Sequence, residues 1–224
     1  MSSQQVDAMK EHFTREAEYR LRDSFPKRIR ELDDLTRVQE FGLKGGMELV
    51  QTQVDKLCDE FKESLPVEGE ANKKQLGINS AIDHVYRLLR PIIVQLIEDT
   101  QTVCMWIQLN IPKIEDGNNF GVSVQEEVLM EAHKIEAEAS AMLDFFIDYT
   151  MLRAKLVSKT LKWSQICDYK RSIRELDEIT FLRLRATLCD SRNYYTRLYD
   201  LLTKNVEKIR CPRNDSESQI SIMY

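Results

Sequence analysis

In the middle of the chain, oxygen-bearing side chains are spaced as they would be in a calcium site. Four residues occupy positions 1, 3, 6 and 12 of the twelve-residue calcium-binding loop: Asp116, Asn118, Gly121 and Glu127. The other positions do not fit, because position 5 is Phe120, position 8 is a serine and position 9 is a valine. Two ligands and the contact that pairs such loops are therefore missing. We predict a tight turn followed by a helix cap instead of a metal site.

Other arrangements that support catalysis are not indicated. A di-metal centre in a helical bundle needs Glu three residues before His on two helices. The residues three before the three histidines are instead Met9, Ala81 and Met130. Adjacent acids such as Glu126 and Glu127 point apart on a helix, and no glycine-rich nucleotide motif occurs. We predict no metal, no cofactor and no enzymatic activity.

The composition narrows the class of protein. The 224 residues carry a net charge of -5, with 42% hydrophobic and 31% charged residues and only 7 Gly and 5 Pro, which is typical of helix-rich chains. A sequence pI near 5.4 argues against nucleic-acid binding. Five widely spaced cysteines predict reduced thiols. No long apolar run occurs, so we expect an intracellular protein that does not enter a membrane.

Long amphipathic helices must position the central segment. Apolar residues recur at helical spacing from about Val6 to about Phe61, with breaks expected at Pro26 and at glycines 42, 45 and 46. The pattern resumes from Ile78 to Pro112, and Pro91 within it should kink the helix without ending it.

Two further helices follow the central segment. Ser123 and Glu126 form a capping box, which predicts a helix from Ser123 to near Leu161. After the joint KWSQI, a last helix should end before Pro212. Because long helices with short connections pack antiparallel, we predict an all-α fold in which residues 1–210 form an elongated antiparallel four-helix bundle.

Three segments lie outside the predicted helices, and two of them, the central loop and the tail, do not fit a plain bundle. Residues 64–77 are polar and rich in helix breakers, which indicates a flexible connector. The loop at 112–122 combines Gly with two Asn, which favour defined turn conformations, so we expect it to be ordered. It could be an ordinary ordered turn or a contact for a partner. Residues 211–224 form a polar tail that ends in apolar side chains beside a free carboxylate, which is typical of a docking peptide but also of a frayed end.

At these residues the sequence closely resembles the 11S proteasome activator (REG) family, especially its gamma type. Stretches over nearly the whole chain carry the resemblance: FPKRIRELD at 25–33, MWIQLNIPKIEDGNNFGVSVQEE at 105–127, RAKLVSK at 153–159, DYKRSIRELDE at 168–178, and KNVEKIRCPR with a terminal Tyr. The resemblance implies a four-helix protomer in a homoheptameric ring that caps the 20S proteasome and stimulates peptide hydrolysis without ATP.

The resemblance also implies roles for the loop and the tail. The activation loop, which opens the gate of the proteasome, would comprise Lys113, Ile114, Glu115, Asp116, Gly117, Asn118, Asn119 and Phe120. Asn118 is the strongest single candidate. The docking residues, which enter pockets between proteasome α subunits, would be Ile222, Met223 and Tyr224.

One departure from the family concerns the connector. Family members usually carry a longer insert between the first two helices, and in the gamma type it holds a basic nuclear-import signal. Here only SLPVEGEANKKQLG is present. The resemblance implies a nuclear location, alongside a cytoplasmic one. The sequence does not determine nuclear import, the ring size or which protease activity is stimulated. The alternative function is a helical adaptor that binds partners through a bundle face.

Overall fold

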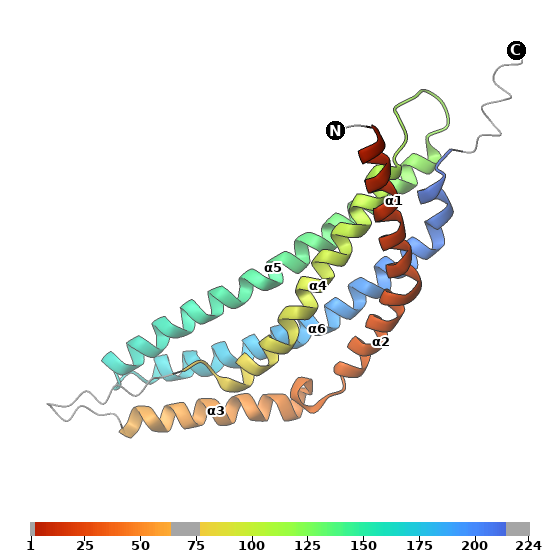
Figure 1. Ribbon diagram of the computed structural model, residues 1–224. Coiled ribbons are helices and arrows are strands. Elements are labelled where there is room, and N and C mark those ends of the chain that lie inside the picture. The colour runs from red at the N-terminus through yellow and green to blue at the C-terminus, as the bar shows by residue number, and fades with distance from the viewer. Residues whose placement is uncertain (1–2, 64–76, 214–224) are drawn as a thin grey trace, which may run out of the picture. The chain divides into compact units, whose positions relative to one another are not determined.

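The computed structural model describes residues 3–63 and 77–213 (Figure 1). Within these ranges the chain is helical and contains no strand. None of the helices in these ranges is long and apolar enough to cross a membrane. Most of the predicted connector and the predicted docking residues 222–224 lie outside the described residues.

The first helical region is divided by two short irregular turns. Helix α1 (Ser3–Tyr19) leads through a π-helical turn, Arg20–Ser24, into α2 (Phe25–Leu35). A 3₁₀ turn at Gln39–Phe41 then precedes α3 (Leu43–Glu63). The predicted break at Pro26 is therefore wrong. Because proline lacks an N–H and its ring crowds the preceding turn, the chain widens into a π turn there and remains helical. The predicted break is confirmed at Gly42, whereas Gly45 and Gly46 lie inside α3.

Three long helices complete the fold. Helix α4 (Ser80–Asn110) continues through Pro91, as predicted. Helix α5 (Phe120–Lys162) and helix α6 (Cys167–Arg210) are separated by a short joint at the predicted place. Together with the interrupted first region they form the predicted antiparallel four-helix bundle.

The chain divides into two compact units. The first unit comprises Met1–Glu31, Val94–Ser140 and Arg192–Tyr224, and the second comprises Leu32–Ile93 and Ala141–Ser191. Because α4, α5 and α6 each contribute a segment to both units, each unit is built from four helical regions. The first unit contains the loop between α4 and α5 and the end of α6.

The first unit contains a buried carboxylate at its centre. Asp99 of α4 is 1% exposed and receives hydrogen bonds from Arg20 Nε at 3.0 Å and from the Tyr195 hydroxyl at 2.8 Å. Arg28 Nε of α2 lies 3.1 Å from Oδ2 of Asp99, the oxygen that also accepts from Tyr195. Burial and the nearby carboxylate raise the pKa of Tyr195, so its hydroxyl stays a donor. One side chain thus connects the π turn, α2, α4 and α6.

The second unit repeats this design with different residues. Asp177 of α6 is fully buried and accepts hydrogen bonds from Arg153 Nε and the Tyr149 hydroxyl of α5, both at 3.0 Å. Asn79 Nδ2 donates to the same carboxylate at 3.0 Å. The Asn79 side-chain oxygen also accepts from the Ala81 N–H at 3.1 Å and caps α4.

The apolar pattern predicts most of the core but not all of it. Ile82, Val103 and Ile135 are buried as expected. Leu152, which the heptad spacing of α5 places inside, is 48% exposed, while its neighbour Arg153 is buried against Asp177. Because an α-helix has 3.6 residues per turn, residues at a strict seven-residue spacing shift gradually around its surface. The buried ion pair with Asp177 then determines that Arg153, and not Leu152, faces the core.

Removing the buried carboxylate of the second unit should strongly destabilise the protein. Asp177→Ala leaves Arg153 buried without a counter-charge, so we expect the free energy of unfolding to fall by about 3–5 kcal/mol. Urea unfolding at fixed protomer concentration measures it. The matched control is Asp55→Ala, which breaks an exposed pair with Arg174 of the same helix α6. Asp55→Ala should lower the free energy of unfolding by less than about 1 kcal/mol. Equal losses in the two variants would contradict a structural role for the Asp177 network.

Candidate functional site

The loop between α4 and α5 presents an exposed surface at one end of the first unit (Figure 1). Residues 111–119 are not helical, and Gly117 adopts a φ of 123°, a region that side-chain-bearing residues rarely enter. Ile114 is fully exposed and Phe120 is 69% exposed. Two large apolar side chains are therefore displayed on an otherwise polar loop.

Helix α5 begins three residues earlier than the predicted capping box. The N–H of Phe120 donates to Asn118 Oδ1 at 3.2 Å, so Asn118 caps the helix. The N–H of Ser123 already donates to the carbonyl of Asn119 at 2.9 Å, as in a regular helix. The capping-box prediction is therefore wrong, because Ser123 already lies in the first turn of α5, and Asn118 upstream accepts the free N–H of Phe120. Residues 120–122 of the predicted loop form the first turn of α5.

Arg213, three residues beyond the end of α6, holds the loop. Its Nη1 donates to the carbonyl of Lys113 and to Glu115 Oε2, both at 3.1 Å. Its Nη2 donates to Asn119 Oδ1 at 2.9 Å. One planar guanidinium thus contacts the start, middle and end of the loop.

A local ion pair adds to this arrangement. Lys113 Nζ lies 2.6 Å from Glu115 Oε1. The hydrogen bond and charge of Lys113, together with the charge of Arg213, lower the pKa of Glu115 from its ordinary 4.5. Because the folded-state pKa is lowered, these contacts are present at neutral pH and are lost as the pH falls through that lowered value.

The ends of three helices meet beneath the loop. Gln125 of α5 is fully buried, and its Nε2 donates to the carbonyl of Asn110 at 3.0 Å and to that of Ile209 at 2.8 Å. These carbonyls belong to the last turns of α4 and α6, where a helix has no internal partner for them. One amide therefore satisfies both helix ends and joins them to α5.

A close backbone contact fixes the same place. A Cβ on Gly121 would lie 1.9 Å from the carbonyl oxygen of Pro212, so only glycine allows the first turn of α5 to approach the end of α6 this closely. Pro212 directly precedes Arg213. The loop, its supporting helix and the root of the C-terminal segment are therefore one packed structure.

The structure brings together some of the predicted loop residues. Lys113, Glu115 and Asn119 contact Arg213, while Asn118 caps α5. Ile114 and Asp116 are exposed. Sequence reasoning missed Arg213 and Gln125, although both lie in or beside stretches that carry the family resemblance. Neither occupies an apolar or motif position, so only their three-dimensional contacts reveal them.

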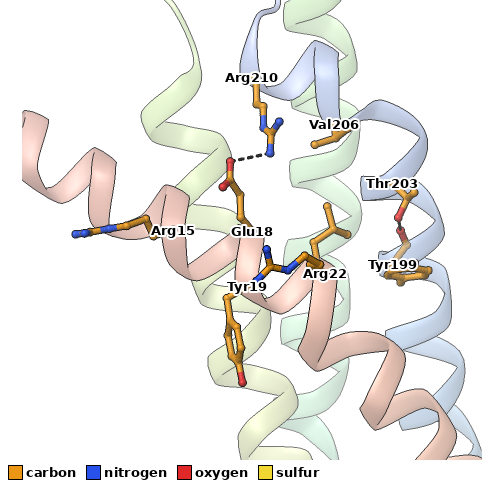
Figure 2. Close-up of a pocket in the computed structure, with 9 residues that line it drawn as sticks. Arg15, Glu18, Tyr19, Arg22, Tyr199, Thr203, Val206 and Arg210 are labelled. Atoms are coloured by element: carbon orange, nitrogen blue, oxygen red, sulfur yellow. Dashed lines mark hydrogen bonds and ion pairs between the residues drawn. The ribbon is translucent and has the colours of Figure 1, made fainter.

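A separate hollow of about 550 Å³ lies between α1 and its following π turn on one side and α6 on the other. Figure 2 shows Glu18 reaching Arg210, which it contacts at 2.7 Å, while Arg15 points away from both. Its lining combines arginines and tyrosines with one acid: Arg15, Glu18, Tyr19, Leu21, Arg22, Tyr199, Thr203, Val206 and Arg210.

Fold and site together define a class: an all-helical bundle that displays a shaped polar loop beside the root of its C-terminal segment. Residues 1–55 match the family model "Proteasome activator PA28, N-terminal", and residues 75–219 match "Proteasome activator PA28, C-terminal". The chain therefore belongs to the proteasome activator PA28 family.

Individual relatives agree over nearly the full length. The chain is 37% identical to proteasome activator complex subunit 3 of Homo sapiens, over 94% of this chain and 92% of that protein. It is 32% identical to proteasome activator 28 of Dictyostelium discoideum, over 97% and 94%. The crystal structure of the 11S subunit of the Plasmodium falciparum proteasome, PA28, matches with a TM-score of 0.76 at 29% identity, covering 94% of each chain.

Loss of Arg213 should loosen the loop without unfolding the protein. In Arg213→Ala the contacts to Lys113 and Asn119 are absent, so we expect cleavage of the Glu115–Asp116 bond by a glutamate-specific protease to become roughly tenfold faster. Mass spectrometry of the intact fragments measures the rate. Arg210→Ala, at the same helix end but paired with Glu18, is the control and should leave this rate unchanged. An unchanged rate in Arg213→Ala would show that the loop holds its shape by other means.

Proposed function

We propose that this chain activates the 20S proteasome without ATP, as a homoheptameric ring that docks on the α subunits. The observation that carries the proposal is the loop held by Arg213 directly beside the root of the C-terminal segment, in a chain of the PA28 family. In this function residues 1–210 supply the rigid bundle, residues 112–122 act on the gate and residues 211–224 dock.

The loop is suited to act on a gate. Its exposed apolar residues, Ile114 and Phe120, stand beside polar groups whose positions are fixed by Arg213 and by the cap at Asn118. A fixed surface can bind an open gate more tightly than a closed one, and this difference in affinity shifts the gate towards the open state. In a flexible loop, the entropy lost when the loop becomes ordered on binding would offset part of that difference in affinity.

The tail supplies affinity. Ile222, Met223 and Tyr224 would enter pockets between α subunits, with the terminal carboxylate held by a cation or by backbone N–H groups. Each tail binds weakly, but seven tails on one ring act at a high effective concentration. Residues 214–224, if fully extended, would span at most roughly 35–40 Å, which lets Ile222 to Tyr224 bind away from the base of the loop.

The proposed activity belongs to the partner's active sites and not to this chain. The relatives are named as activators, that is, as regulators of the proteasome. The chain would therefore raise the rate of peptide hydrolysis by the 20S particle and perform no hydrolysis itself.

For location we propose the nucleus together with the cytoplasm. The alignment with the human relative is 238 positions long, more than the 224 residues of this chain, so that relative carries residues that this chain lacks. We place the missing residues in the short connector at 64–77. Import then depends on signals other than the basic insert of the gamma type.

A helical adaptor is the alternative function. The hollow between α1 and α6 favours it, because a partner could bind there and ignore both the loop and the tail. The two functions differ in which segment a partner needs, and the following variants separate them.

Deletion of Met223 and Tyr224 should abolish association with 20S particles, because each docking tail loses its apolar end and its natural carboxylate position. The native mass of the oligomer should stay unchanged, since the deleted residues lie beyond the bundle. Native mass measurement of the protein, alone and mixed with 20S particles, reads out both properties. Unchanged association would favour the adaptor function and refute the role of the tail.

Replacing the capping asparagine by a bulky residue should separate docking from activation. In Asn118→Phe the cap of α5 is lost and a large ring enters the loop, so we expect association with 20S particles to persist while stimulation of fluorogenic peptide hydrolysis is lost. Asn118→Ser can still cap the helix and should retain most of the stimulation. Full stimulation by Asn118→Phe would contradict the role of the loop.

A further inference from the structure

Three metal-ligating side chains gather between α4 and α5 of the first unit, below the loop that joins these helices. They are Cys104 of α4 and His133 and Glu136 of α5, whose donor atoms all lie within 4.8 Å of one another. Cys104 is buried, His133 is half exposed and Glu136 is 25% exposed. The cluster is therefore anchored in the core and open to solvent on one side.

The distances between the donor atoms approach those of a zinc site. Cys104 Sγ lies 3.8 Å from His133 Nδ1, and His133 Nδ1 lies 3.4 Å from Glu136 Oε2. With Zn–S near 2.3 Å and Zn–N and Zn–O near 2.1 Å, a tetrahedral site places sulfur about 3.6 Å from nitrogen and nitrogen about 3.4 Å from oxygen. Two edges of the tetrahedron thus already have nearly the required length. The third edge, between sulfur and the carboxylate oxygen, is at most 4.8 Å long and needs to shorten by at most about 1.2 Å.

Two neighbouring side-chain amides contact the ligands, Gln101 at Glu136 and Gln108 at His133. Gln101 Nε2 donates to the outer oxygen of Glu136 at 2.8 Å, which turns the inner oxygen towards His133. The side-chain amide of Gln108 lies 3.4 Å from the second ring nitrogen of His133. The Gln108 atom at this distance is Nε2, so a metal at Nδ1 requires this amide to turn over, after which its oxygen accepts the Nε2–H of His133.

We propose that Cys104, His133 and Glu136 bind a divalent zinc-like cation, with water at the fourth position. The combination of thiolate, imidazole and carboxylate favours zinc over magnesium or calcium, which prefer oxygen ligands alone. On binding, the thiol proton is released to solvent and the sulfur bonds to the metal as a thiolate. The site is independent of the proposed function in proteasome activation.

The cation would act as a cross-link between the two helices that carry the loop. Cys104 lies six residues before the end of α4, and the two ligands of α5 lie in its fourth and fifth turns. A metal here restrains the same helices that Gln125 joins beneath the loop. The site would thereby stabilise the first unit in the folded state, since a cation that binds only that state adds to its stability.

Cobalt(II) titration of the full-length protein, freed of metal by a chelator, tests the site. We expect one cobalt per chain with the intense visible bands of tetrahedral geometry and a thiolate-to-cobalt charge-transfer band in the near ultraviolet. Competition by zinc should remove both. Cys104→Ser should abolish the charge-transfer band, and His133→Gln and Glu136→Gln should each weaken binding more than about 100-fold, beyond the usual cost of an outer-shell change. Gln101→Leu should weaken binding by roughly tenfold.

Matched controls distinguish this site from chance binding at other cysteines and histidines. Cys189→Ser and His84→Gln should leave the cobalt spectrum unchanged, and circular dichroism should confirm that each variant is folded. If Cys104→Ser does not fold, the exposed substitution His133→Gln decides. The proposal is overturned if wild-type protein shows no charge-transfer band, if the band persists in folded Cys104→Ser, or if His133→Gln binds cobalt as tightly as wild type.

Discussion

The shape of the loop depends on how the ends of the helices beneath it are hydrogen-bonded. The last carbonyls of a helix have no hydrogen-bond partner within the helix and need one from elsewhere. Gln125 satisfies such carbonyls on α4 and α6 with one buried amide, and thereby joins both helices to α5. The contact between Gly121 and Pro212 then leaves no space for a side chain between α5 and the end of α6. Because these three helix ends are fixed against each other, a nine-residue stretch, 111–119, can hold a defined shape above them.

This arrangement places the proposed activation loop beside the start of the proposed docking tail. Arg213 is at once the anchor of the loop and the last described residue before the tail. In the proposed function, a pull on a docked tail would be transmitted to a residue that hydrogen-bonds the loop. In a ring, such a connection would keep each loop at a constant offset from its docking pocket. The proposed cation between α4 and α5 would strengthen the same support from below.

The two units use the same physical solution to specify their helix packing. Each buries one aspartate, Asp99 or Asp177, and surrounds it with arginine and a tyrosine hydroxyl from other helices. Apolar faces alone permit helices to slide or rotate, whereas a buried carboxylate tolerates only the register in which its partners meet it. Exposed pairs such as Lys204 with Asp200 add little, since water screens them.

The sequence by itself determined the helical class, the four-helix plan and the place of the loop, because these follow from periodicity, prolines and glycines that act locally. It misplaced the start of α5 by three residues and put Leu152 in the core, since Asn118 and Arg153 act through specific contacts. Arg213, Gln125 and the Cys104 cluster have no local signal: His133 and Glu136 stand in the reverse order of the motif we sought, and Cys104 comes from another helix. Only the tertiary structure brings together residues separated by 29 to 100 positions, because hydrogen bonds and metal ligation depend on distances in space and not along the chain.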